Sequence, residues 1–446
     1  MHKPSISPSR TRDPFLDLVR TMAVLAVVGQ HWIMPVLGYD NATVATGNAL
    51  TTPGWWAFTW LSQVMPLVFF AGGAANLISL GRSTNTRLWL GARVHRLLLP
   101  VLPLTAVWLV VPELLRGLGV PEQPLQVAGS IAAQLLWFLA VYLLTVLATP
   151  LLAAAHRRWG LAVPLALAGA AALVDVARFA DVPLVGYANA VFVWLAVHQL
   201  GFHYTRGRLG ELHGRRALGL AAGGFSITAL LVLAGPYPAS MIGMPGAPMS
   251  NMSPPTVLLT FLAVGQIGLL LAARPALNAL AARPGPRAAL SWLGPRFMTV
   301  YLWHMPALIV VAGVTVLGLG YATPAPGSLD WFAAMPVWLL LAGAVLLGLL
   351  RVFGRFEVRQ AAVAAVVPTV QLVAAGVLGS TGLLGLAAGG FTTPPGADLL
   401  GGPLPWVAIV LGAYLLTNRP LPVRQAGVRL LTWSVATWNS ARGTRV

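Results

Sequence analysis

The stretch from Phe15 to Trp32, FLDLVRTMAVLAVVGQHW, decides the fold, because it is long and apolar yet contains both Arg20 and His31. Their separation of eleven residues is almost three helical turns at ~100° per residue, so both side chains lie on one face, roughly 16 Å apart along the axis. Ionisable groups at bilayer depth are costly and usually functional. We therefore predict a membrane helix whose Arg20 and His31 line one cavity, where the arginine holds an anion and the histidine moves a proton.

The composition extends this interpretation to the whole chain. Hydrophobic residues make up 57% and charged residues 9% of the sequence, whereas soluble domains have ~25% charged residues. The prediction is an all-α, polytopic transmembrane helix bundle of about twelve spans. The expected spans are residues 15–38, 56–80, 97–115, 130–154, 161–178, 183–203, 217–235, 255–273, 297–320, 331–350, 361–386 and 403–418.

The net charge of +17 indicates topology rather than a nucleic-acid partner. With a cytoplasmic N-terminus, all but Arg116 and Arg178 of the 28 Lys and Arg residues fall on the inner side. This is the positive-inside pattern, which predicts that both termini are cytoplasmic and that the inner face meets anionic lipid. Heavy use of Ala, Gly and Arg is typical of a high-GC bacterial genome, so we expect a multi-pass protein of the bacterial plasma membrane.

Further candidate residues lie beyond the first span. Arg93 and Arg96 are i, i+3 neighbours that suit a diphosphate clamp, although ordinary positive-inside charge is an alternative. His304 lies within a span, where it either serves the cavity or hydrogen-bonds a neighbour. Asp17, one turn before Arg20, is placed to orient that guanidinium by a salt bridge.

Two features concern packing rather than chemistry. Residues 236–254 carry no charge, so this loop is expected to fold back over the mouth of the bundle. Asp175 and Arg178 are i, i+3 neighbours and are expected to pair locally.

Taken in order along the chain, these segments resemble the membrane acyltransferase-3 family, which comprises bacterial multi-span O-acyltransferases. The resemblance rests on Leu16-Asp17-Leu18-Val19-Arg20 through His31, Phe69-Phe70-Ala71-Gly72, Arg93-x-x-Arg96 before Leu-Leu-Leu-Pro, Trp137-Phe138-Leu139, the Ser-Pro-Pro-Thr of 253–256, and Tyr301-Leu302-Trp303-His304. Ala-Gly-Gly-Ala at 71–74 departs from the commoner Ser-Gly-Phe, which indicates a subfamily with a different acceptor.

The resemblance implies a ten-helix core, and it divides the chain into four parts. These are a cytoplasmic tail at 1–14, an acyltransferase-3-like membrane domain at 15–350, two additional transmembrane helices at 351–420, and an amphipathic basic cytoplasmic tail at 421–446.

The same resemblance implies residue roles. Arg20 and His31 take catalytic roles, and Arg93, Arg96 and Arg20 bind the donor, with Asp17 and His304 in support. The expected donor is a cytoplasmic acyl-coenzyme A, most simply acetyl-coenzyme A, and we expect no metal and no permanently bound cofactor. The expected acceptor is a hydroxyl of a sugar, a glycan or a natural product.

Two mechanisms stay open for His31. It either deprotonates the acceptor hydroxyl or carries the acyl group itself. The absence of a His-x-x-x-x-Asp signature disfavours phospholipid acylation of the type that uses it, because none of the eight histidines has Asp five residues later. The chain also lacks cysteine, which excludes thiol catalysis.

Two functions from other classes compete with the enzyme. A transporter or flippase fits the span number, but the sequence shows no repeat between halves. An inert assembly partner is disfavoured, because it would not require the costly ionisable side chains of Arg20 and His31 inside an apolar helix.

Overall fold

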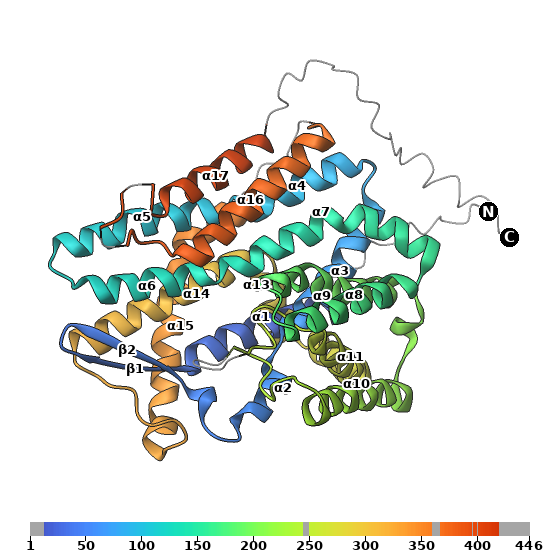
Figure 1. Ribbon diagram of the computed structural model, residues 1–446, viewed down its shortest axis with the longest axis horizontal. Coiled ribbons are helices and arrows are strands. Elements are labelled where there is room, and N and C mark those ends of the chain that lie inside the picture. The colour runs from blue at the N-terminus through green and yellow to red at the C-terminus, as the bar shows by residue number, and fades with distance from the viewer. Residues whose placement is uncertain (1–12, 244–248, 359–365, 395, 399, 419–446) are drawn as a thin grey trace.

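The computed structural model describes residues 13–243, 249–358, 366–394, 396–398 and 400–418, and within these ranges the fold is a bundle of α-helices with one small β-hairpin (Figure 1). The helices are α1 (Pro14–Ile33), α2 (Thr59–Ser62), α3 (Met65–Arg82), α4 (Thr86–Leu98), α5 (Val101–Gly117), α6 (Glu122–Gln134), α7 (Leu136–Trp159), α8 (Ala162–Phe179), α9 (Asn189–Arg206), α10 (Gly214–Ala234), α11 (Leu258–Ala272), α12 (Arg274–Ala282), α13 (Pro284–Leu293), α14 (Phe297–Ala312), α15 (Leu329–Val358), α16 (Thr369–Gly389) and α17 (Leu404–Leu416). The hairpin consists of β1 (Pro35–Asp40) and β2 (Thr43–Asn48), which pair antiparallel.

The ends of α1 are fixed by local chemistry. Asp13 is the N-cap, and its carboxylate accepts hydrogen bonds from the backbone N–H groups of Phe15 at 3.0 Å and Leu16 at 3.4 Å. Asp13 also accepts a hydrogen bond from the Tyr204 hydroxyl at 2.8 Å, which ties this end of α1 to α9. The helix ends at Ile33, just before Pro35, because a proline and the residue before it disfavour helix continuation. The expected span of 15–38 is therefore too long, since its last residues belong to β1.

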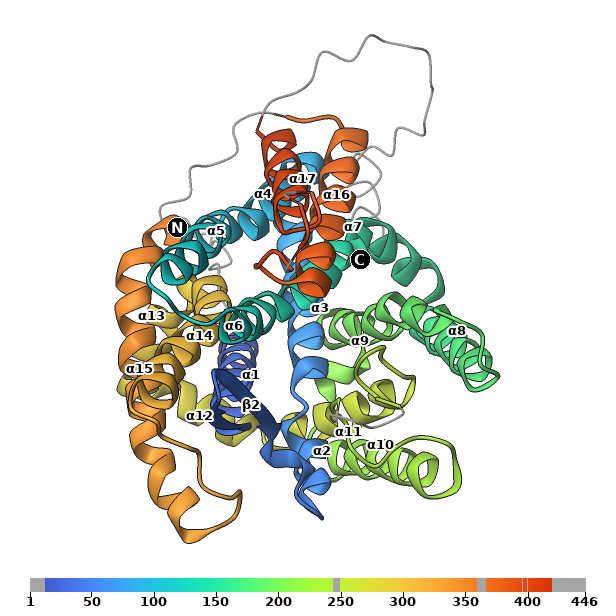
Figure 2. The same ribbon diagram turned by 60° about the vertical axis from the view of Figure 1, so that its left-hand side comes forward.

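The centre of the bundle is formed by α1 and α3. In Figure 2 these two helices lie in the middle, with α15 along one edge, α16 and α17 at the top, and α8 and α10 at the other side. Close packing of α3 against α9 depends on glycines, because a Cβ on Gly73 would collide with the backbone carbonyl of His198 and one on Gly201 with that of Phe70. Small residues at such contacts are how membrane helices approach one another.

The number of spans differs from the expected twelve. In the described part of the chain, nine helical stretches are long and apolar enough to cross a membrane, or ten if α11 and α12, which are bent by 61°, form one span. The 13-residue α17 is a shorter apolar helix, and α1, which contains Asp17, Arg20, Gln30 and His31, is not among the nine. The prediction of an all-α membrane bundle is confirmed, while the count of twelve and the orientation remain predictions.

The described residues of the loop between α10 and α11 are hydrogen-bonded to the rest of the bundle, while the expected cover over the mouth of the bundle remains a prediction. Gln63 donates to the carbonyl of Met241 at 2.9 Å, and Trp60 donates to that of Ala239 at 2.9 Å. Arg178 donates to the carbonyl of Pro254 at 3.2 Å. The loop therefore packs over the segment that joins α2 to α3.

Asp175 and Arg178 lie close enough for the charge of Arg178 to act on Asp175, but the hydrogen bonds of Asp175 come from other residues. Asp175 is fully buried and accepts hydrogen bonds from Asn189 at 2.7 Å, from the Tyr237 hydroxyl at 3.1 Å and from the Val257 backbone at 2.8 Å. Arg178 instead turns to the loop carbonyls. Three fixed donors satisfy a buried carboxylate better than one partly exposed i, i+3 cation does.

The two C-terminal helices pack as an antiparallel pair along α4, α6 and α7. Glycines on α16 make room for the neighbouring side chains, since a Cβ on Gly385 would enter the Trp406 ring, one on Gly382 would meet Val410, and one on Gly379 would meet Leu98 and Leu143. The amphipathic basic tail expected at 421–446 lies outside the described residues.

Candidate active site

Two histidines meet in the centre of the bundle, one from α1 and one from α14. The Nδ1 of His31 lies 2.9 Å from the Nε2 of His304. The two rings are parallel within 3°, and their centroids are 5.2 Å apart. This centroid separation suits rings that meet edge to edge through an in-plane hydrogen bond rather than rings stacked face to face.

The direction of the hydrogen bond between the rings follows from the second nitrogen of His304. Its Nδ1 lies 2.6 Å from the carbonyl oxygen of Tyr301, which only accepts hydrogen bonds, so Nδ1 carries the proton. In neutral His304 the Nε2 is then an acceptor, and the Nδ1 of His31 must donate to it. His31 is thereby held in the tautomer whose Nε2 has a free lone pair. That nitrogen is the basic atom of the pair.

The histidine pair is held in place by indole and phenol groups. The Trp32 indole donates to the carbonyl of His304 at 2.9 Å, and the Trp338 indole donates to the carbonyl of Trp32 at 2.9 Å. The Tyr301 hydroxyl donates to the carbonyl of Leu135 at 2.8 Å. His304 is fully buried, whereas His31 is only half-buried. The network fixes His304 rigidly and leaves His31 as the member that another molecule can reach.

The arginines gather at the other end of α1. Arg93 of α4 donates to the Ser79 hydroxyl of α3 at 2.7 Å and lies 5.7 Å from the centre of the Trp89 ring. Arg20 and Arg96 are close enough to Arg93 for their positive charges to act on it. Arg20 also packs over the Phe297 ring at 5.2 Å, at the start of α14.

Along α1, the groups that suit anion binding are separated from the groups that suit proton transfer. Arg20 and His31 both belong to the uninterrupted α1, so roughly 16 Å of helix axis lies between the arginine cluster and the histidine pair. Three guanidinium groups near one another repel, and an anion with several charges relieves that repulsion. The arrangement suits a ligand with a polyanionic end and a reactive end.

Asp17 lies one turn before Arg20 on α1, as the sequence requires. Its backbone N–H donates to the carbonyl of Asp13 at 3.1 Å, and its own carbonyl accepts a hydrogen bond from the Thr21 hydroxyl at 2.8 Å. The salt bridge through which Asp17 orients Arg20 remains a prediction.

Several residues of the site were not identified from the sequence. Ser79 anchors Arg93, and Glu357 lies at the end of α15 near Arg96. Glu357 is buried and accepts hydrogen bonds from the backbone of Met298 at 3.1 Å and of Thr299 at 2.8 Å, which caps the N-terminus of α14. The available signal for Glu357 was an acidic residue shortly after the expected span 331–350, whereas nothing in the sequence distinguishes Ser79 from other serines.

The helix that carries the two arginines is braced by α17. His95, between Arg93 and Arg96 in α4, lies with its Nδ1 3.2 Å from the Thr417 hydroxyl and its ring 4.9 Å from that of Tyr414. The Thr417 hydroxyl itself donates to the carbonyl of Tyr414 at 2.7 Å, so it accepts from His95.

Comparison with known proteins gives one result. Residues 13–352 match the acyltransferase-3 family, whose description is an acyltransferase domain, and this range is well over half of the chain. No curated protein and no solved structure matches the chain. The match favours an enzyme over a transporter and over an inert assembly partner. The chain belongs to the acyltransferase-3 family, and it is a membrane-embedded acyltransferase that acts on acyl groups other than amino-acyl groups.

Proposed function

We propose that this acyltransferase takes its acyl group from a cytoplasmic acyl-coenzyme A, with acetyl as the simplest group, and transfers it to a hydroxyl of an acceptor. The observation that carries the proposal is the pairing of His31 with His304 at one end of α1 and the arginine cluster at the other. Coenzyme A is an anion with phosphates at one end and a thioester at the other, so it matches both ends of this arrangement.

In this proposal the arginines bind the phosphates of the donor. Arg93, Arg96 and Arg20 supply charge-assisted hydrogen bonds, which are worth about 1.5–3 kcal/mol each. Ser79 and Trp89 hold Arg93 in advance, which lowers the entropic cost of binding. The thioester then extends along α1 toward His31.

His31 acts as the general base. Its Nε2 takes the proton of the acceptor hydroxyl as the oxygen attacks the thioester carbonyl, so that a C–O bond forms and the C–S bond breaks. The proton then passes from His31 to the leaving sulfur, and the products are an ester and free coenzyme A. His304 is a positioning residue, because it fixes the tautomer of His31 and stabilises the imidazolium through the carbonyl of Tyr301.

The proposal is tested with the purified protein in lipid nanodiscs. Titration with acetyl-coenzyme A is expected to show saturable binding, and addition of an acceptor is expected to release one thiol for each ester formed. Absence of both binding and thiol release would contradict the donor assignment.

The two possible roles of His31 are separated in the same preparation. Direct transfer predicts no acylated protein when labelled acetyl-coenzyme A is supplied without acceptor. A labelled peptide containing His31 would show instead that the histidine carries the acyl group.

A further inference from the structure

A row of aromatic side chains links the histidine pair to the arginine cluster. The ring centroid of Tyr301 lies 5.8 Å from that of His304, and the centroid of Phe138 lies 5.1 Å from that of Tyr301. Phe138 and Tyr142 are i, i+4 neighbours on one face of α7, and their ring centroids are 5.6 Å apart. The row therefore runs from the buried histidine to Tyr142.

Tyr142 lies at the arginine end of this row. It is close enough to Arg93 for the two side chains to interact electrostatically, although the guanidinium group of Arg93 donates its hydrogen bond to Ser79. A Cβ on Gly72 would lie 2.7 Å from the Tyr142 ring and 3.0 Å from its hydroxyl oxygen, so the end of this side chain contacts α3. Gly72 and Ser79 are i, i+7 neighbours on α3, which places them on the same face about 10 Å apart. Tyr142 and Arg93 thus meet the same face of α3.

The hydroxyl of Tyr142 is available to a ligand. The side chain is half-buried, and its hydroxyl makes no hydrogen bond within the part of the chain that the structure describes. By contrast, the hydroxyls of Tyr204, Tyr237 and Tyr301 each donate to a carboxylate or a backbone carbonyl. A phenol inside a bundle is stabilised by a hydrogen-bond partner, and for Tyr142 a bound molecule can supply it.

The order of groups along the row matches the order of groups in the proposed donor. Coenzyme A joins its phosphates to the thioester through a pantetheine arm, which carries amide groups and no charge. The guanidinium group of Arg93 is followed by the uncharged Tyr142 and Phe138, and then by the histidine pair. An uncharged arm enters such surroundings at low cost provided that its amides find hydrogen-bond partners.

We propose that Tyr142 binds the pantetheine arm of the donor by donating its hydroxyl to an amide carbonyl, while the rings of Phe138 and Tyr301 direct the thioester toward the histidine pair. This inference rests on the proposed function. It assigns Tyr142 to the arm of the donor and leaves the phosphates to the arginines.

The experiment compares acetyl-coenzyme A with ADP, which carries a diphosphate but no arm, on the purified protein in lipid nanodiscs. Tyr142→Phe removes only the hydroxyl. We expect it to weaken acetyl-coenzyme A binding about three- to tenfold, the loss that one neutral hydrogen bond causes, and to leave ADP binding unchanged. Arg93→Ala combined with Arg96→Ala is expected to weaken the binding of both ligands.

Tyr39→Phe is the matched control for the loss of a hydroxyl. Tyr39 is also half-buried, but it belongs to β1, which follows the histidine end of α1 and lies away from the arginines. Its variant is expected to bind both ligands as wild type does.

A second measurement detects contact with the donor directly. A p-azidophenylalanine in place of Tyr142 keeps an aromatic ring of similar size and crosslinks to a group that meets its far end. We expect it to crosslink radiolabelled acetyl-coenzyme A, and an excess of unlabelled acetyl-coenzyme A to abolish the crosslink. The same amino acid in place of Tyr39 is expected to give no crosslink.

The failure of this inference differs from the failure of the proposed function. An unchanged acetyl-coenzyme A affinity in Tyr142→Phe would overturn the inference, and so would equal losses for acetyl-coenzyme A and ADP, because Tyr142 would then act on the phosphate site. If Tyr142→Phe does not fold, the absence of a crosslink at position 142 would overturn it instead. Wild-type protein that does not bind acetyl-coenzyme A would contradict the proposed function itself, and the inference would fall with it.

Discussion

His31 and His304 are 273 positions apart in the sequence, yet their rings are parallel within 3° and joined by a contact of 2.9 Å between Nδ1 and Nε2. The fully buried ring is bonded to a backbone carbonyl, and the half-buried ring has its remaining nitrogen free. His304, held by the carbonyl of Tyr301, thus fixes the tautomer of His31, much as a buried carboxylate fixes the tautomer of the catalytic histidine in a serine-histidine-aspartate triad.

This relationship predicts the behaviour of His304 variants. His304→Phe removes the acceptor for the Nδ1–H of His31, and we expect kcat to fall on the order of 10²-fold because the base loses its fixed tautomer. His304→Gln provides an amide oxygen as a substitute acceptor and is expected to recover part of the loss. The KM for acetyl-coenzyme A is expected to change little in either variant, and the pH profile of kcat is expected to shift.

A purely structural His304 would give a different pattern. Folded yield would fall in both variants, while the surviving protein would keep the wild-type kcat and pH profile. Steady-state kinetics across pH on protein purified by size exclusion distinguishes the two cases.

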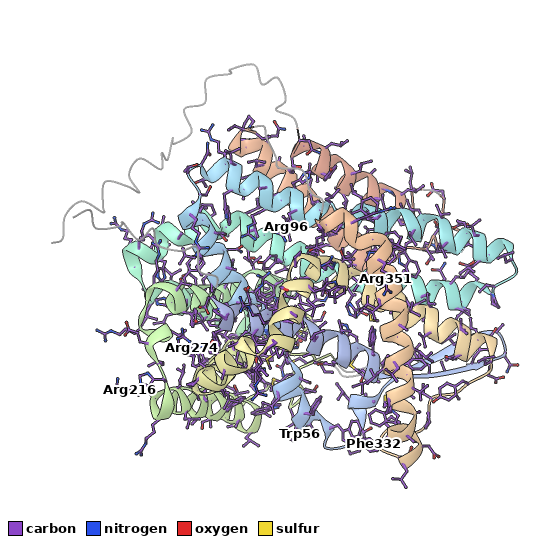
Figure 3. All side chains as sticks on the ribbon, turned by 180° about the vertical axis from the view of Figure 1, so that it is seen from behind. Trp56, Arg96, Arg216, Arg274, Phe332 and Arg351 are labelled. Carbon is purple, nitrogen blue, oxygen red and sulfur yellow. The ribbon has the colours of Figure 1, made fainter. Side chains whose placement is uncertain are left out.

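The arginine cluster predicts the cost of removing donor contacts. Arg93→Ala combined with Arg96→Ala is expected to weaken coenzyme A binding roughly ten- to a hundredfold, since a charge-assisted hydrogen bond is worth about 1.5–3 kcal/mol. The matched control is Arg215→Ala combined with Arg216→Ala, which removes two exposed positive charges at the start of α10 (Figure 3). Isothermal titration with coenzyme A gives both affinities. Equal affinities in the two double variants would show that Arg93 and Arg96 do not bind the donor and serve only as positive-inside charges.

The sequence predicted the helical class, and it singled out arginines and histidines that the structure brings together, but it did not predict the residues that support them. Arg20, His31 and His304 stand out because ionisable groups inside apolar runs are rare. The contact between His31 and His304 was not predictable, since periodicity orients residues within one helix and says nothing about which helix lies opposite.

The errors have a similar origin. The expected first span is five residues too long. Met34, Pro35, Val36 and Leu37 are as hydrophobic as the residues of a membrane helix, but Pro35 disfavours a helix there. The sequence predicts that Arg178 pairs with Asp175 on the same helix. The groups that donate hydrogen bonds to Asp175 belong instead to α9, to Tyr237 and to Val257, which only tertiary packing brings near it.

The contact between His95 and Thr417 predicts that the C-terminal helices support donor binding. Thr417→Val keeps the shape of the side chain and removes the hydroxyl that accepts from His95. We expect a loss of stability of about 1 kcal/mol and a several-fold weaker affinity for coenzyme A, because α4 carries Arg93 and Arg96. The control is Thr228→Val, another buried threonine whose hydroxyl donates within its own helix, at 2.9 Å to the carbonyl of Gly224.

Thermal unfolding and coenzyme A titration of both threonine variants provide the measurement. If both variants lose the same stability and only Thr417→Val has a weaker affinity for coenzyme A, the contact between His95 and Thr417 supports donor binding. If both variants bind coenzyme A as wild type does, α16 and α17 have no part in the donor site.

The distribution of basic residues predicts the orientation of the chain. In the predicted twelve-span topology all but Arg116 and Arg178 of the 28 Lys and Arg residues fall on one side, so both termini are expected to be cytoplasmic. A reporter that is active only in the cytoplasm, fused after Val446, is expected to give full signal, and one active only in the periplasm is expected to give none. The reverse result would contradict the prediction of twelve spans with a cytoplasmic N-terminus.

His31 carries the most decisive prediction. His31→Ala removes the Nε2 that the His31–His304 contact leaves free to take the proton of the acceptor, so transfer is expected to fall by at least 10²-fold while acetyl-coenzyme A binding and folded yield stay near wild type. His31→Gln retains a group that can donate to His304 Nε2 and thus preserves the packing of α1 against α14. Because a carboxamide does not accept a proton near neutral pH, His31→Gln is expected to be as inactive as His31→Ala. Rates of thiol release with saturating acceptor and donor provide the comparison, and an active His31→Gln protein would show that another group accepts the proton and that His31 only holds α14 in place.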